Sequence, residues 1–349
     1  MRLKEMAYSL GQESTWILAC LIIHMLLGMV SISLAADDVW AKKADMPTAR
    51  RFLSTSVMDG KIYAVGGMDD RAGSSFATLE VYDPAADGWT EKADMPAPSR
   101  AVGLASLGGK IYAIGGNPTW NTVYEYDPVA DEWTQKDDTP TRRGGMGMAV
   151  VDDKIYAIGG FSANAMLNTV EVYDPETDTW EKKSSMLTKH EGLGVGVVNG
   201  RIYAISGLFP GAFTNGVEEY DPETDTWTKK ASIPTPRCYF GTAVVDGKIY
   251  VMGGWTPAGN IQTVEIYDPE TDTWSEGDDM PERRSSLSAS AVNGRIYAIG
   301  GTKDWCNAWQ GCPVLSLVEE FDTGSLLEKS IDAKEKLATT WGDIRRGRQ

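Results

Sequence analysis

The chain has 349 residues, and its 33 Lys and Arg stand against 49 Asp and Glu, which gives a formal net charge of −16. Such acidity argues against a nucleic-acid partner, which would need a basic groove, and it fits a soluble, self-repelling surface. The only histidines are His24 and His190, so a metal site built from several histidines is excluded. The sequence also lacks a phosphate-binding glycine loop ahead of a helix, and we expect no cofactor.

Residues 1–35 have the order of a secretory signal. Arg2 and Lys4 precede an apolar run from Trp16 to Val30, and small residues follow that run. This order predicts cleavage before Ala36 and export to the periplasm or the cell exterior, with no membrane insertion afterwards. An uncleaved membrane anchor is the alternative, because the apolar run is nearly long enough to span a bilayer.

Beyond the signal, one pattern occurs six times along the chain. Every copy contains strand-like apolar segments and a glycine pair, and the pair recurs every 44 to 49 residues. The pairs are Gly66/Gly67, Gly115/Gly116, Gly159/Gly160, Ser206/Gly207, Gly253/Gly254 and Gly300/Gly301. A period of this length built from strand patterns predicts a β-propeller, with one four-stranded blade per repeat.

Each repeat predicts four strands in a fixed order. The first is apolar, as in residues 241–245, and an Asp-Gly or Asn-Gly pair that accepts the positive φ angles of a tight hairpin follows it in four copies. The second reads Ile-Tyr-Ala-Ile or nearly so and ends at the glycine pair. The third carries Val-Glu-x-Tyr-Asp, and an Asp-Pro-x-x-Asp turn then leads to a fourth strand that begins at a tryptophan. We expect turn residues such as Asp174 and Asp178 to hold the turn rather than a calcium ion.

The two ends of the repeat region predict how the ring closes. The last copy stops at Phe321 without a fourth strand, whereas Trp40 precedes any first strand. The segment from Val39 to Lys43 is therefore expected to complete the last blade, so that no edge stays unpaired. The predicted fold is all-β: a six-bladed propeller of four-stranded antiparallel blades over residues 36–322, followed by a tail at 323–349. We expect a monomer.

These motifs resemble the Kelch repeat family. Its hallmarks are the double glycine, a tyrosine in the third strand and the following tryptophan, and they recur together over residues 37–322. The tyrosines are Tyr82, Tyr126, Tyr173, Tyr220 and Tyr267, with Phe321 in the last copy. The resemblance implies the propeller fold and leaves function open, because the family includes protein-binding modules, oxidases and sugar mutarotases. The copper-radical oxidases of the family need more than one histidine ligand, so their activity is not expected here.

Two sets of residues are candidates for a binding site, on the face where the fourth-to-first and second-to-third strand connections open. The first set is mainly basic and enters the first strand of each repeat, which predicts a ring of cations around the channel mouth, suited to a carboxylate or phosphate. Its members are Arg50, Arg100 (beside Ser99), Arg143, His190, Arg237 and Arg284. The alternative is internal pairing with third-strand glutamates, at Glu80, Glu171, Glu218, Glu265 and Glu319.

The second set consists of aromatic residues in the second-to-third strand loops, outside the repeat pattern. They are Trp120, Phe161, Phe209, Phe213, Trp255, Trp305 and Trp309. Such side chains suit stacking on a sugar or anchoring in a protein partner, and packing over their own blades is the alternative. Cys306 and Cys312 lie in the last of these loops and are predicted to form a disulfide in an oxidising compartment. Cys238 lies in an apolar run and is predicted to be a core residue.

These features predict an exported binding module that holds a protein segment or a glycan, with an acidic group, over the channel mouth. One alternative is a periplasmic enzyme similar to the six-bladed sialic acid mutarotases. In that case His190 and Glu191 are the acid–base pair, beside an arginine that holds the sugar carboxylate. A further alternative is a structural domain of a surface assembly.

Overall fold

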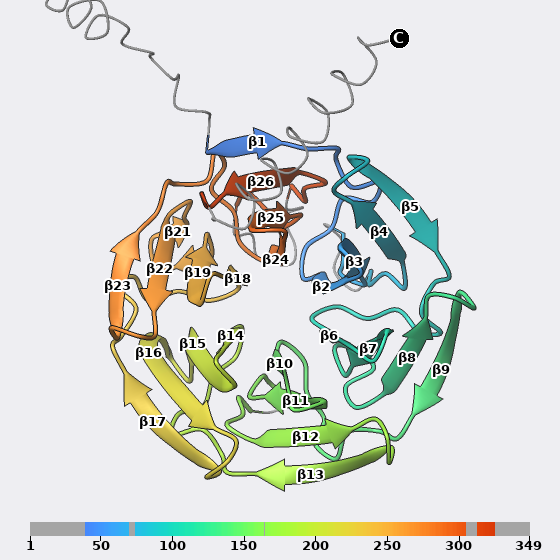
Figure 1. Ribbon diagram of the computed structural model, residues 1–349, viewed down its shortest axis with the longest axis horizontal. Helices are drawn as coiled ribbons and strands as arrows, with labels where there is room; N and C mark the ends of the chain where they lie inside the picture. Colours follow the sequence, from blue (N-terminus) through green and yellow to red (C-terminus); the bar gives the residue numbers. More distant parts are fainter. Residues whose placement is uncertain (1–38, 70–73, 164, 305–312, 325–349) are drawn as a thin grey trace, which may run out of the picture. The chain divides into compact units, whose positions relative to one another are not determined.

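The computed structural model describes residues 39–69, 74–163, 165–304 and 313–324. In this part of the chain, six four-stranded antiparallel sheets are arranged as blades around a central channel (Figure 1). The all-β, six-bladed propeller predicted from the repeats is thus confirmed. The predicted signal and most of the predicted tail lie outside the described residues. Within them, no helix has the length and apolar character needed to cross a bilayer.

The four strands of a blade, called a to d here, run from the channel outward. Blade 1 consists of β2 (Ser54–Met58), β3 (Lys61–Val65), β4 (Leu79–Asp83) and β5 (Gly88–Lys92). Blade 2 consists of β6 (Gly103–Leu107), β7 (Lys110–Ile114), β8 (Val123–Asp127) and β9 (Glu132–Lys136). Blade 3 consists of β10 (Gly147–Val151), β11 (Lys154–Ile158), β12 (Val170–Asp174) and β13 (Thr179–Lys183).

The other three blades differ in detail. Blade 4 consists of β14 (Gly194–Val198), β15 (Arg201–Phe209), β16 (Ala212–Asp221) and β17 (Thr226–Lys230). Blade 5 consists of β18 (Gly241–Val245), β19 (Lys248–Met252), β22 (Val264–Asp268) and β23 (Thr273–Glu276), with a small hairpin of β20 (Trp255–Thr256) and β21 (Gly259–Asn260) in its b–c loop. Blade 6 consists of β24 (Ser288–Val292), β25 (Arg295–Ile299), β26 (Val318–Asp322) and β1 (Trp40–Lys42). Its outer strand β1 comes from the N-terminal side of the repeats and pairs with β26, with Trp40 opposite Phe321.

The hydrophobic core lies between neighbouring blades. One buried cluster joins Ala105 and Tyr112 of blade 2 to Ile155, Ala157 and Tyr173 of blade 3, and other clusters join other neighbours in the same way. Strand b is buried almost throughout because blades cover both of its faces. A single blade therefore has no core of its own, and the stability of the ring depends on the contacts between blades.

The repeated tyrosine, aspartate and tryptophan form a clamp from one blade to the preceding one. In blade 3 the Tyr173 hydroxyl donates to Asp178 Oδ1 (2.5 Å), and the same oxygen accepts the backbone N–H of Asp137 in blade 2 (3.1 Å). Trp180 Nε1 donates to the carbonyl of Asp137 (3.0 Å). Asp174 accepts the backbone N–H of Glu176 inside the turn (3.0 Å). The predicted turn-forming role is confirmed for Asp174, whereas the Asp178 side chain bonds to Tyr173 and to the preceding blade.

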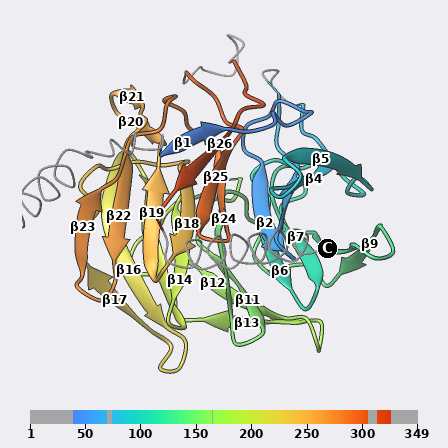
Figure 2. The ribbon, with the colours of Figure 1, turned by 45° about the horizontal axis from the view of Figure 1, so that its top comes forward.

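The strand connections open on two opposite faces of the disc. The a–b and c–d turns form one side, here the turn face, and the d–a connections and b–c loops form the other, here the loop face. Figure 2 shows turns such as that between β16 and β17 at one edge and the β20–β21 hairpin at the other. On the turn face, Asp246 and Gly247 both have positive φ (48° and 73°), as predicted for the tight hairpin.

Candidate functional site

A closed ring of six backbone hydrogen bonds surrounds the channel at the loop face. One residue from each d–a connection donates its N–H to the corresponding carbonyl of the preceding blade, over 2.6 to 3.1 Å. In blade order these residues are Phe52, Ala101, Gly145, Gly192, Tyr239 and Ser286. All six have positive φ, between 52° and 62°. The ring fixes the backbone at the channel mouth, and the side chains beside it determine what the mouth can bind.

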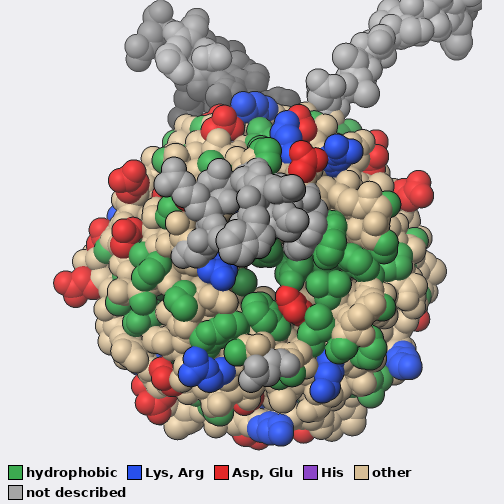
Figure 3. Space-filling model, turned by 180° about the vertical axis from the view of Figure 1, so that it is seen from behind, with side chains coloured by type: hydrophobic (Ala, Val, Ile, Leu, Met, Phe, Trp, Pro, Cys, Tyr) green, Lys and Arg blue, Asp and Glu red, His purple; other side chains and the backbone are tan. Residues whose placement is uncertain are grey.

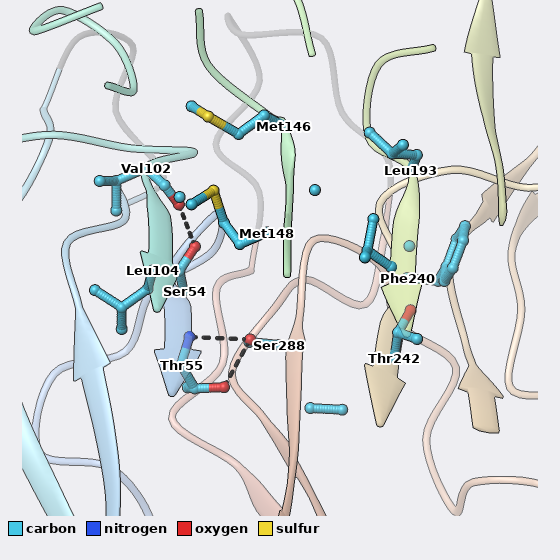
Figure 4. A pocket seen from close by; sticks show the side chains of 15 residues that line it. Ser54, Thr55, Val102, Leu104, Met146, Met148, Leu193, Phe240, Thr242 and Ser288 are labelled. Carbon is cyan, nitrogen blue, oxygen red and sulfur yellow. Dashed lines mark hydrogen bonds between the residues drawn. The ribbon is translucent and has the colours of Figure 1, made fainter. Parts of the chain in front are cut away.

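Below the ring, the channel is narrow and lined by uncharged side chains. Its volume is about 190 Å³, and residues at the start of strand a in all six blades contribute to its wall. On one side Thr55 Oγ1 and Ser288 Oγ lie 2.8 Å apart in a hydrogen bond (Figure 4). Met146, Met148 and other apolar side chains line other parts of the wall. No charged residue is among the described residues that line the channel, so it offers no ion pair to a ligand.

The structure corrects the predicted ring of cations. The four repeated arginines, Arg50, Arg143, Arg237 and Arg284, are completely buried and lie inside their blades rather than at the channel mouth. Each pairs with the strand-c glutamate of its own blade, respectively Glu80 (2.8 Å), Glu171 (2.6 Å), Glu265 and Glu319 (2.6 Å). Internal pairing, the alternative reading, therefore holds for all four.

Blade 3 shows what such an arginine does. Arg143 Nη1 donates to the carbonyls of Ala157 (3.1 Å), Gly159 (3.2 Å) and Thr169 (3.0 Å). Nη2 donates to the Glu171 carboxylate, which also accepts the Thr141 hydroxyl (2.6 Å). Burial lowers the pKa of these arginines despite the glutamate, in the case of Arg50 to about 10. The arginine thus ties the d–a connection to strands b and c as part of the framework.

Blade 2 lacks this framework unit as a whole. Ser99 stands at the arginine position, Tyr124 at the glutamate position and Ala97 at the position of the supporting threonine. Ser99 is buried and donates to the Gly115 carbonyl (3.3 Å). The neighbouring Arg100 is only half-buried and donates to Ser75 Oγ (3.1 Å). Because blade 2 lacks both the arginine and the glutamate, no buried carboxylate is left without a cation at this position.

His190 takes the arginine position in blade 4. It is buried, with 3% of its surface exposed. Its Nε2 is hydrogen-bonded to the Thr188 hydroxyl and lies 3.8 Å from Glu218 Oε1. Burial raises the pKa of Glu218, but the nearby His190 and the hydrogen bonds from the Thr188 hydroxyl and the Leu187 amide outweigh burial and lower the pKa. His190 therefore belongs to the blade framework and is not placed at the channel mouth, where an acid–base role would require it.

The predicted loop aromatics fall into three groups. Trp120 and Phe161 of neighbouring blades pack edge to face with centroids 5.3 Å apart, and Phe213 and Trp255 do the same at 4.9 Å. All four are half-buried, which agrees with packing between loops. Phe209 is 42% exposed. The remaining candidates, Trp305 and Trp309, and the predicted disulfide of Cys306 and Cys312 lie outside the described residues. Cys238 is buried, as predicted.

Sequence reasoning missed an aromatic pair at the mouth itself. Phe52 and Tyr239 are ring residues of blades 1 and 5, and their side chains meet edge to face at 5.2 Å, past the small Ser286 of blade 6 between them. Arg51 Cζ lies 5.5 Å from the centre of the Phe52 ring, within cation–π range. A signal existed in the sequence: two residues after each repeated arginine position, four blades have a small residue and these two have a large aromatic one.

Tyr239 connects this pair to a carboxylate. Its hydroxyl donates to Glu191 Oε1 of blade 4, the residue that precedes ring member Gly192. The tyrosine ring lies directly against Gly192, where a Cβ atom would be 2.5 Å from Tyr239 Cδ1, so only glycine fits there. Burial raises the pKa of Glu191 above its usual value, although the Tyr239 hydrogen bond opposes the rise. Glu191 is thus a half-buried carboxylate held at the channel mouth.

A second cavity of about 400 Å³ opens beside Glu191, between blades 3 and 4. Its walls are mostly apolar, and Lys189 and Glu191 are its charged members. The lining residues are Phe161, Ser162, Ala165, Met166, Lys189, Glu191 and Pro210. Lys189 is exposed and makes no ion pair with Glu191 among the described contacts. The loop face therefore offers an apolar hollow with one carboxylate on its wall.

The fold and this face define a propeller with an uncharged channel and a structured loop face. The Kelch motif matches residues 49–96, 142–187, 191–234 and 236–281, and the chain belongs to the Kelch family. Among solved structures, the chain is similar to one titled "Structure of YjhT", with a TM-score of 0.67 and 18% identity over 79% of this chain and 96% of that chain. At this identity the similarity shows the fold. No curated protein matches the sequence.

Proposed function

We propose that this Kelch propeller is a binding module that holds a segment of a partner protein on its loop face, over the channel mouth. The observation that carries the proposal is the difference between the two faces. The turn face repeats the same aspartate-rich turns from blade to blade, whereas the loop face differs in every blade. Figure 3 shows hydrophobic side chains around the central opening, with basic and acidic groups beside it. Such a mixed apolar surface is typical of protein-binding sites.

The geometry favours binding over the enzyme alternative. A mutarotase of the predicted kind needs an acid–base pair beside an arginine at the mouth. His190 is buried in its blade, and the four repeated arginines are neutralised by glutamates. The same burial removes the main argument for an acidic ligand. Export, which rests on the N-terminal sequence, remains part of the proposal.

Phe209 provides a direct test of the face. It is 42% exposed on the loop face, and Val129, in a c–d turn of the opposite face, is 93% exposed. We select a peptide ligand from a random library and expect Phe209→Ser to lower the affinity for it by about tenfold, as for an aromatic contact residue. Val129→Ser is the matched control and should leave the affinity unchanged. Both affinities are measured by calorimetry on the full chain.

Three outcomes contradict the proposal. In the first, no peptide is selected while an array of neutral and acidic glycans gives a ligand, which favours the glycan alternative. In the second, the Val129 variant weakens binding as much as the Phe209 variant, which places the site elsewhere. In the third, binding requires a sugar that the protein also interconverts between anomers, which restores the enzyme alternative.

A further inference from the structure

We propose that the hollow beside Glu191 binds a lysine or arginine side chain of the partner segment. This inference deepens the proposed function and rests on it. The hollow has the two parts that such a side chain needs: apolar walls from Phe161, Met166 and Pro210 for the aliphatic stem, and the Glu191 carboxylate for the charged head. It opens on the loop face, at the edge of the backbone ring.

The buried glutamates of strand c show by contrast why Glu191 is available. Glu80, Glu171, Glu265 and Glu319 each have an arginine from their own blade. Glu191 has a different polar partner, the Tyr239 hydroxyl, and no cation pairs with it among the described residues. A half-buried carboxylate without a cation costs free energy in the unbound protein. An incoming cation would recover that cost, because it favours the ionised form.

Steric detail shows that the carboxylate is held in place. The Tyr239 ring lies against Gly192 and packs edge to face with Phe52, so the tyrosine hydroxyl has little freedom to leave Glu191. Near the carboxylate stem, a Cβ at Gly145 would lie 3.4 Å from the Phe161 ring and 3.9 Å from Glu191 Cγ. Glu191 is therefore fixed between a hydrogen-bond donor and an apolar wall, as expected of a preorganised recognition group.

The net charge of the whole chain also favours a basic ligand. The chain carries a formal net charge of −16, so a basic segment is attracted from a distance. The cation that lines the same hollow is Lys189, which is exposed. Lys189 competes with an incoming cation, and its position at the rim leaves the Glu191 carboxylate without an ion pair. Removal of the Glu191 charge should therefore weaken binding of a basic peptide, and removal of the Lys189 charge should strengthen it.

The experiment is a positional-scanning library of acetylated, amidated decapeptides, selected on the full chain at low ionic strength. We expect Lys or Arg at one position, and replacement of that residue by norleucine should weaken binding by about tenfold, the size of a charge-assisted hydrogen bond. Glu191→Gln should weaken the basic peptide equally. The norleucine replacement should then have no further effect, because the two changes remove one interaction. Lys189→Met should strengthen binding by about twofold to fivefold.

Glu176→Gln is the matched control, since it removes the same charge from an exposed position on the turn face. It should leave the affinity within about twofold of the original. If peptides are selected without a basic residue, or if Glu191→Gln and Glu176→Gln have equal effects, the Glu191 subsite is wrong and the proposed function stands. If no peptide is selected, the proposed function and the subsite both fail. Thermal unfolding of each variant confirms that it is folded.

Discussion

Removal of a buried arginine should be costly, and the cost should depend on what else its glutamate accepts. Arg143→Met leaves Glu171 buried without its cation, which typically costs about 3–5 kcal/mol. Glu171 would still accept the Thr139 hydroxyl (3.0 Å), the Thr141 hydroxyl (2.6 Å) and the Thr141 amide (3.3 Å), so we expect the lower end of that range.

Arg50→Met should cost more, near the upper end of the same range. Glu80 is completely buried, and apart from Arg50 it accepts the Thr48 hydroxyl (2.7 Å) as its hydrogen bond within the described residues. A second change, Glu80→Gln, removes the buried charge and should restore part of the lost free energy of unfolding. The Arg50 variant would still lack the donor to the Gly66, Thr78 and Ala64 carbonyls, so the recovery is incomplete.

The assay is urea unfolding followed by tryptophan fluorescence, with Lys61→Met as the control. Lys61 forms an exposed pair with Asp83 at 2.9 Å, and its loss should leave the unfolding midpoint unchanged. The reasoning is refuted if Arg50→Met and Arg143→Met shift the midpoint no more than Lys61→Met does. It is also refuted if Glu80→Gln adds its full cost on top of Arg50→Met, because the two groups would then be uncoupled.

Three further predictions concern the mouth and the clamps. Because burial raises the pKa of Glu191, folding favours its protonated form, so the contribution of Glu191 to wild-type stability becomes more favourable as the pH falls. Glu191→Gln should be the more stable protein near pH 7, with the difference between the two proteins gone by about pH 4 in melts across that range. Gly192→Ala should destabilise the fold by about 1–3 kcal/mol, because the position has φ of 62° and Tyr239 occupies the space of the new Cβ, whereas Gly88→Ala has room and should change the urea midpoint little. Asp178→Ala removes two hydrogen bonds of the clamp between blades 2 and 3 and should lower stability by about 1–3 kcal/mol in the same urea assay; an unchanged midpoint would show that the clamp contributes nothing.

The fold could be predicted from the sequence because the same local motifs recur in each blade. The Asp246-Gly247 pair specifies a hairpin through its positive φ angles, and the tyrosine, aspartate and tryptophan of each repeat recur where the clamp needs them. The period-2 pattern of strand a and the apolar run of strand b then follow from burial between neighbours. These are local signals, and they needed no knowledge of the ring.

The site could not be predicted in the same way. Arg143 precedes strand a, and whether its side chain turns into the channel or into the blade depends on the d–a backbone, which no local pattern encodes. The glutamate that recurs with the same period indicated internal pairing, because blade 2 replaces the counterparts of both Glu171 and Arg143. Phe52 and Tyr239 were missed for the opposite reason: they break the repeat, and only the three-dimensional ring brings blades 1 and 5 into contact.

The backbone ring at the channel mouth has an electrostatic consequence. Its six amide groups all donate in the same rotational sense around the axis, so the circumferential components of their dipoles nearly cancel in sum. Each of those six N–H groups is also already engaged, so the ring has no amide to spare for an anion. The charge at the mouth therefore comes from side chains. Among the residues that precede the ring members, Arg51, Arg100 and Glu191 are charged, whereas Gly144, Cys238 and Ser285 are uncharged. Arg100 and Glu191 are only half-buried, so substitutions at these two positions can change the charge that the propeller offers to a partner while its backbone stays the same.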